Sequence, residues 1–388
     1  MNRLMDTIKK RLGKVRGQAV FLAVVCMLCA VLAMLPTGIP LAVPENGSRE
    51  KARVESVDNS MLAPLGIVYS GTQTAQVTLL TGPYKGQTVM AVNALNSALD
   101  KDKLFESGDT ALVLVQSKDG QPFSATLIDH YRVDTQLLLL LLFAVLIILI
   151  GGISGCGALI SLTASVLLIW KVLIPMLLKG VAPIPAALLT VALLTSVTMF
   201  LVGGFTRRAL TAFLGSILGT ALTCVLTIVF GDWLRMDGGD IPYATALLAQ
   251  SSLQIDLRQL YFAMVFLGNS GALMDLAMDI ASACDEVSIN QPAITRGELI
   301  RSGFSVSRSV IGTQTTTLML AYSGNFLSML MYFMAQGTPV IDILNYKFVV
   351  SEILLTLVGS FGLVTVAPFT ALVSGWVCLR RKNGEAQA

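Results

Sequence analysis

Charged residues and histidine are scarce in this sequence. Of its 388 residues, 13% are charged and 54% are hydrophobic, and the mean hydropathy is +0.73. Soluble domains carry about 25% charged residues, so the composition excludes an ordinary soluble protein and predicts an integral membrane protein in a lipid bilayer. The formal net charge of +3 is too small to favour a nucleic-acid partner.

Cysteine is absent from residues 37–135, which excludes a disulfide within that segment. Cys26 and Cys29 form a C-x-x-C pattern inside an apolar run, but no other cysteine or histidine is near in sequence to complete a metal site. We interpret them as small residues that pack a helix. The sequence therefore predicts no metal site and leaves any cofactor unknown.

Eight stretches of about 20 apolar residues are long enough to cross a bilayer. They are residues 18–36, 137–155, 158–178, 183–204, 209–230, 259–283, 309–334 and 348–378, with a tight hairpin at 152–158. With eight spans, the basic clusters at 9–16, 207–208, 296–308 and 380–382 all fall on one side. The positive-inside rule then places both termini, including the tail 381–388, in the cytoplasm. We expect a multi-pass protein of the cell membrane.

The first span, within residues 1–36, has two interpretations. Basic residues precede its apolar run, as in a secretory signal peptide, but a run of about 19 residues is longer than the usual 7–15. We favour an uncleaved signal-anchor helix, and cleavage is the alternative. Either interpretation leaves the later spans unchanged.

Residues 37–135 have a different character from the spans on either side. β-branched and polar residues alternate over 66–92, which Gly-Pro and Lys-Gly turn signals interrupt, and further strands are predicted within 107–120 and 123–128. We predict a small all-β domain outside the membrane, a barrel of five or six strands. The fold class is thus an α-helical polytopic membrane protein with an extracytoplasmic β domain after its first helix and a seven-helix domain at 136–380.

Two aspartates stand inside the predicted sixth span. Asp275 and Asp279 are four residues apart, so they share one helix face, which Ser282 continues. A carboxylate inside the bilayer costs at least about 2.5–3.5 kcal/mol. Such residues usually face a partner or a water-filled path, so these two indicate a polar interior.

The predicted seventh span carries a polar band at a comparable depth. Thr313, Gln314 and Thr317 lie about 7–14 Å above Arg308 at 1.5 Å per residue, and the two threonines share a face. We predict that this band meets the aspartates and forms a site for an ion, a proton or a small-molecule substrate. Hydrogen bonding between helices, with a structural role alone, is the alternative.

Two further charges are predicted inside the membrane. Lys171 lies in the third span and Glu352 near the outer end of the eighth. Each charge is costly alone, so we expect the two to form an ion pair, unless Lys171 extends outward to the interface.

Enzyme motifs are incomplete. Gly268, Asn269, Ser270 and Gly271 match the G-x-S-G pattern of rhomboid proteases, but the only histidine, His130, is far earlier in sequence. Intramembrane aspartyl proteases need aspartates on facing helices, whereas the two in this chain share one helix. We therefore predict no catalytic residue and no enzyme activity, with an intramembrane hydrolase as the least favoured alternative.

The segment GNSGALMDLAMDIASACDEV, residues 268–287, resembles the signature of the YibE/F-like family of bacterial membrane proteins. Further matches are residues 84–87 with Asn93, 108–109, 174–175 with 179–180, 298–303, and 311–322 followed by Gly324. The resemblance implies an N-terminal anchor, an extracytoplasmic β domain and a membrane bundle, and it implies no established activity. The family pattern has a basic Gly-Arg-Lys-Gly-type hairpin where this chain has Gly155, Cys156 and Gly157.

For function, the polar residues inside the spans favour a transporter or permease whose path passes Asp275, Asp279 and the Thr313–Thr317 band. The alternative is a non-transporting scaffold or assembly factor whose β domain binds a protein of the cell envelope. Aspartates that line a polar cavity would favour the first, and aspartates sealed by helix contacts would favour the second.

Overall fold

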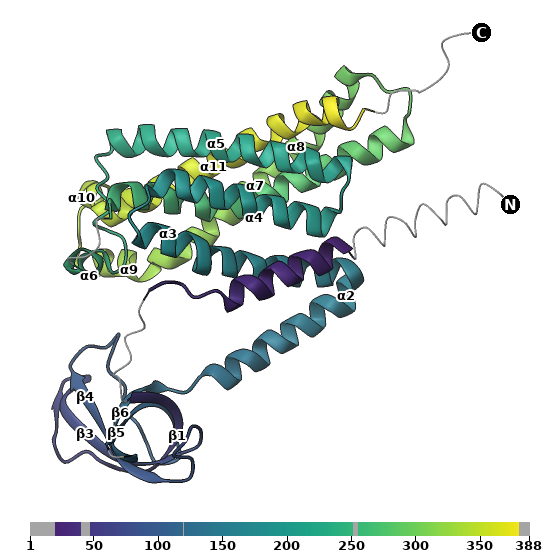
Figure 1. Cartoon of the computed structure of the whole chain (residues 1–388). Helices are drawn as coiled ribbons and strands as arrows, with labels where there is room; N and C mark the ends of the chain where they lie inside the picture. Colours follow the sequence, from purple (N-terminus) through teal and green to yellow (C-terminus); the bar gives the residue numbers. More distant parts are fainter. Residues whose placement is uncertain (1–19, 40–46, 119, 251–254, 380–388) are drawn as a thin grey trace, which may run out of the picture. The chain divides into compact units, whose positions relative to one another are not determined.

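The computed structural model describes residues 20–39, 47–118, 120–250 and 255–379, which form two compact units. Ile39–Leu146 make up a β unit, and Met1–Gly38 with Ile147–Ala388 make up a helical unit (Figure 1).

The β unit is a sheet of six strands with the order β1-β5-β6-β4-β3-β2. The strands are β1 Gly47–Asp58, β2 Leu62–Leu65, β3 Val68–Leu79, β4 Thr88–Asn96, β5 Thr110–Lys118 and β6 Gln121–His130. Because β1 also pairs with β3, five strands close into a barrel, and the short β2 adds to β3 outside it. All pairs are antiparallel except β4 with β6. The predicted β barrel is confirmed, and its Greek-key path is that of OB-type barrels.

Alternation along each strand builds the barrel core. The burial of β4 switches at every residue, which places Val89, Ala91 and Leu95 inside and their neighbours outside. Phe105, from the segment between β4 and β5, is also buried in this core. Its backbone nitrogen donates to Gln73 Oε1 at 3.1 Å, and its carbonyl accepts from Gln73 Nε2 at 2.9 Å. A fully buried amide side chain thus holds this segment in place.

The helical unit begins with the helix Val20–Met34. The following helices are α2 Val133–Leu168, whose first part belongs to the β unit, the π-helical turn η1 Ile169–Leu173, α3 Ile174–Leu178, α4 Pro183–Gly203, α5 Arg207–Trp233, α6 Ala244–Ala249, α7 Leu257–Asn290, α8 Arg296–Ser323, the 3₁₀ turn η2 Gly324–Phe326, α9 Leu327–Ala335, α10 Val340–Asn345 and α11 Lys347–Val377. Helices α4, α5, α7 and α11 run side by side in Figure 1.

Six helices in the described part of the chain are long and apolar enough to cross a membrane. They are Val133–Gly152, Ser154–Leu178, Pro183–Gly203, Arg207–Trp233, Leu257–Asn290 and Lys347–Val377, and each overlaps one predicted span. The predicted span 309–334 is instead a pair, α8 and α9, bent by 61°, which gives a seventh if the pair counts as one. The first predicted span is a shorter apolar helix, and residues 18–19 of it lie outside the described residues.

Glycine sets the closest approaches between these helices. Gly152 has a φ of 52°, which reverses the chain inside α2, and a Cβ on Gly155 would lie 2.3 Å from the Ile147 carbonyl oxygen. The chain therefore turns at the start of the predicted hairpin 152–158, between the helices Val133–Gly152 and Ser154–Leu178, and residues 154–158 are helical. A Cβ on Gly215 would lie 2.1 Å from Thr370 Oγ1, and one on Gly219 would lie 2.9 Å from Val366. The Gly215-x-x-x-Gly219 motif thus brings α5 against α11.

Candidate functional site

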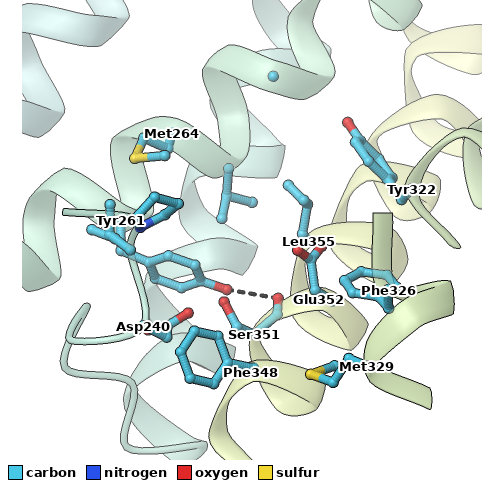
Figure 2. A pocket seen from close by; sticks show the side chains of 14 residues that line it. Asp240, Tyr261, Met264, Tyr322, Phe326, Met329, Phe348, Ser351, Glu352 and Leu355 are labelled. Atoms are coloured by element: carbon cyan, nitrogen blue, oxygen red, sulfur yellow. Dashed lines mark hydrogen bonds between the residues drawn. The ribbon is translucent and has the colours of Figure 1, made fainter. Parts of the chain in front are cut away.

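A cavity of about 350 Å³ lies at the end of the helical unit where α7 and α11 begin. Its walls come from the loop before α6, the first turns of α7, the end of α8, the η2–α9 bend and the start of α11. Figure 2 shows the lining side chains, which are mostly apolar and aromatic and include Tyr261, Met264, Tyr322, Phe326, Met329 and Phe348.

Two carboxylates, Asp240 and Glu352, line this cavity. In the view of Figure 2 they lie on either side of the Tyr261 hydroxyl. Asp240 is only 8% exposed. Among the described residues, neither Asp240 Oδ1 nor Glu352 Oε2 has a hydrogen-bond partner, although both atoms are buried. Unpartnered carboxylate oxygens are costly, so they are strong acceptors for a ligand that brings a positive charge or donors.

Two basic side chains at this end of the helical unit form ion pairs outside the cavity. Lys347 forms an ion pair with Asp237, and Arg258 forms one with Asp232. The Lys347 ammonium and the backbone N–H of Gly239 both bond the Asp237 carboxylate and hold its pKa below the ordinary value. Among the residues that the structure describes, no lysine or arginine lines the cavity beside its two carboxylates.

Hydrogen bonds fix the aromatic wall. The Tyr261 hydroxyl donates to the Ser351 carbonyl at 2.8 Å, which joins α7 to α11. The Tyr322 hydroxyl donates to Asn269 Oδ1 at 3.0 Å, which joins α8 to α7. Asn269 is fully buried and fits only because Gly359 faces it, since a Cβ there would lie 2.0 Å from Asn269 Oδ1. These hydrogen bonds thus fix Tyr261 and Tyr322, two aromatic residues of the cavity wall.

The two predicted aspartates lie on α7, where no other described side chain bonds them. Asp275 and Asp279 are both exposed on the surface of the helical unit, as is Glu286, and Ser282 is half-buried between them. The described residues give neither aspartate a hydrogen bond or an ion pair. Their predicted role as an ion or substrate site is not tested by this arrangement.

The predicted threonine band does not bond the aspartates in the described structure. The Thr313 hydroxyl donates to the Val310 carbonyl and the Thr317 hydroxyl to the Thr313 carbonyl, both at 2.9 Å and within α8. Both threonines are exposed, and Gln314 is half-buried. The hydroxyls therefore satisfy their own helix, as threonine in an apolar helix often does.

One face of α7 connects the cavity with the aspartates. Met264 and Gly268 line the cavity and are exposed, and Gly271, Asp275 and Asp279 follow on the same face at helical spacing. Asp275 lies about 10 Å along the helix from Gly268 at 1.5 Å per residue. The two polar sites, the cavity and the aspartates, therefore share one uncovered stripe of α7.

Lys171 and Glu352 are not brought together as an ion pair among the described residues. Lys171 Nζ donates to the Leu35 carbonyl at 2.8 Å, just beyond the C-terminal end of the helix Val20–Met34. A carbonyl at a helix end is a favourable partner for a lysine. Glu352 instead lines the cavity with Asp240.

Sequence reasoning singled out Glu352 but missed Asp240, Tyr261 and Tyr322. Asp240 follows two glycines in a connection between predicted spans, and nothing in its surroundings marks it as buried. The available signal was Asn269, an amide in the middle of an apolar span, because a buried amide needs partners.

The comparison with protein families matches the YibE/F-like protein model to residues 139–380, which spans α2 from its second turn to the end of α11. The match includes the whole cavity and leaves the barrel strands outside it. No curated protein and no solved structure matches the chain.

Proposed function

The chain belongs to the YibE/F-like family, and we propose that it is a membrane transporter whose cavity binds a small organic cation between Asp240 and Glu352. The apolar helices and the family indicate a membrane location. The proposal extends this coarse assignment to a substrate class.

One observation carries the proposal: two buried carboxylate oxygens without partners lie in a cavity that has aromatic walls and no basic residue. An ammonium group placed there would neutralise the carboxylates and lie against the faces of Tyr261, Phe326 or Phe348. The described residues include no group of three or more His, Cys, Asp or Glu placed to hold a metal ion. An organic cation therefore fits the lining better than a metal ion does.

The stripe on α7 supports movement of the cation from the cavity along the helix. From Gly268 to Asp279 this face offers no bulky side chain except the two aspartates, and their charge is costly against lipid. A water-filled path along this face would relieve that cost. Asp275 and Asp279 would then form a second cation or proton site below the first.

The topology in this proposal has eight spans, both termini in the cytoplasm and the barrel outside the plasma membrane, so the cavity opens outward. Cysteines introduced singly at positions 72 and 386, in a background without the native cysteines, test this arrangement. A membrane-impermeant maleimide should label position 72 in intact cells and position 386 only after lysis. The reverse pattern would refute it.

Binding of tetramethylammonium to the purified chain in nanodiscs tests the cation site. Calorimetry should detect binding to the wild type, and Glu352→Gln and Asp240→Asn should each weaken it at least tenfold. Asp342→Asn, on exposed α10 and outside the cavity, removes the same charge at the same end of the unit and should leave binding unchanged.

Equal binding by the wild type and Glu352→Gln would contradict the cation site. Absence of binding, together with capture of an envelope protein by the barrel, would favour the alternative of a scaffold or assembly factor. The specific support for that alternative is the outer face of β3 and β4, where Thr72, Thr74, Met90 and Val92 form an uncharged surface.

A further inference from the structure

A second cavity of about 250 Å³ adjoins the first between α8, α9 and α11. Its lining is almost wholly apolar and includes Met319, Leu330, Val349, Ile353 and Leu357. Three residues, Phe326, Met329 and Glu352, line both cavities. Glu352 is therefore reached from a charged, aromatic cavity on one side and from an apolar groove on the other.

This second cavity, called the apolar groove from here on, lies on an uncovered side of the helical unit. Met319 is 60% exposed and Leu357 is 54% exposed, although both belong to helices that cross or begin to cross the apolar layer. In a bilayer such a surface faces hydrocarbon. A molecule in the groove would thus have its apolar part against lipid-facing side chains and its other end at Glu352.

We propose that the substrate is an amphiphilic cation: an amine or quaternary ammonium group bound between Asp240 and Glu352, with one alkyl chain in the apolar groove. This rests on the cation site of the proposed function and adds the chain. Along α11 the groove runs from Val349 to Leu357, about 12 Å at 1.5 Å per residue, which matches roughly nine or ten methylene groups. The carboxylates disfavour an anionic head group of the same chain length.

Alkyltrimethylammonium ions of two lengths separate the head-group site from the groove. Each buried methylene strengthens binding by about fourfold. Decyltrimethylammonium, below its micellar concentration, should bind the chain in nanodiscs at least a hundredfold more tightly than butyltrimethylammonium. Decyl sulfate, with the same chain and opposite charge, should not compete with either.

Variants that fill the groove separate binding in the groove from partition of the probes into lipid, because partition does not depend on the groove side chains. Thr356→Phe and Ser323→Phe place a ring in the groove without touching the first cavity. Both should reduce the preference for the decyl over the butyl probe to under tenfold. Leu372→Phe, an exposed apolar residue of α11 outside both cavities, is the matched control and should keep the wild-type preference.

The outcomes distinguish the two levels of the proposal. Butyl binding that depends on Glu352 but has no greater affinity for the longer chain would overturn the groove and leave the cation site intact. A chain preference that persists in both filled variants would also overturn the groove, because it would report partition alone. Binding of neither ammonium ion would overturn both.

Discussion

Replacement of Gly359 by alanine tests whether the contact between α7 and α11 positions the cavity wall. The new Cβ would lie 2.0 Å from Asn269 Oδ1 and 2.5 Å from its side-chain carbon, far inside van der Waals contact. Asn269 has no free space to move into, since it is fully buried and donates to the Val265 carbonyl at 2.8 Å. It also accepts from Tyr322.

The expected free-energy change is the balance of three terms. Alanine stabilises a helix by about 1 kcal/mol relative to glycine. Overpacking costs about 1–3 kcal/mol, and displacement of Asn269 weakens two or more hydrogen bonds of about 1 kcal/mol each. The net prediction for Gly359→Ala is a loss of about 2–4 kcal/mol in the free energy of unfolding.

Gly312→Ala is the matched control, because α8 leaves open space where its Cβ would lie. It should be neutral or stabilise by up to about 1 kcal/mol. Thermal unfolding of both variants in nanodiscs, with tetramethylammonium binding as a second readout, measures the difference. Equal unfolding temperatures for the two variants would refute the reasoning. Normal cation binding by a destabilised Gly359→Ala would show that Asn269 stabilises the helices without positioning the cavity wall.

Three further predictions concern other parts of the chain. Gln73→Leu should destabilise the barrel by about 2–4 kcal/mol, because two buried backbone groups lose their partner, and hydrogen exchange of barrel amides should accelerate while helical amides stay protected. If Asp275 and Asp279 carry a cation or proton, Asp→Asn at either should preserve membrane abundance and abolish cation uptake; normal uptake in both would favour a structural role. Lys347 lowers the folded-state pKa of Asp237. The ion pair therefore stabilises the folded chain above the ordinary pKa near 4, and this stabilisation is lost as pH falls through the lower pKa of the folded state. The difference in unfolding temperature between the wild type and Asp237→Asn should therefore be larger at pH 6 than at acid pH, where Asp237 is protonated in both the folded and the unfolded chain.

Hydropathy predicted most of the helices because their length and composition are local properties of the sequence. It did not predict the bend of 61° between α8 and α9, which lies at Gly324–Phe326 within the predicted span 309–334. Window averages do not detect such a bend. Strand β1 was also missed, because its charged outer residues mask the buried Ala52 and Val54 between them.

The candidate site was harder to predict because its residues come from distant segments. Asp240, Tyr261 and Glu352 meet only after α7 and α11 have packed, and hydropathy says nothing about which helices become neighbours. The aspartates of α7 were visible because they are charged within an apolar span. Asp240 lies outside any span, so its burial depends on tertiary structure alone.

The pairing of β1 with both β3 and β5 has a consequence for the synthesis of this protein. Residues 47–53 of β1 need partners at 110–116, so the barrel cannot close until nearly all of it has been made. Contacts of such large sequence separation slow folding and leave strand edges exposed in the meantime. The connection from β6 to α2 is only two residues, His130 to Val133. Synthesis of the last barrel strand and synthesis of the next apolar helix therefore follow each other closely during translation.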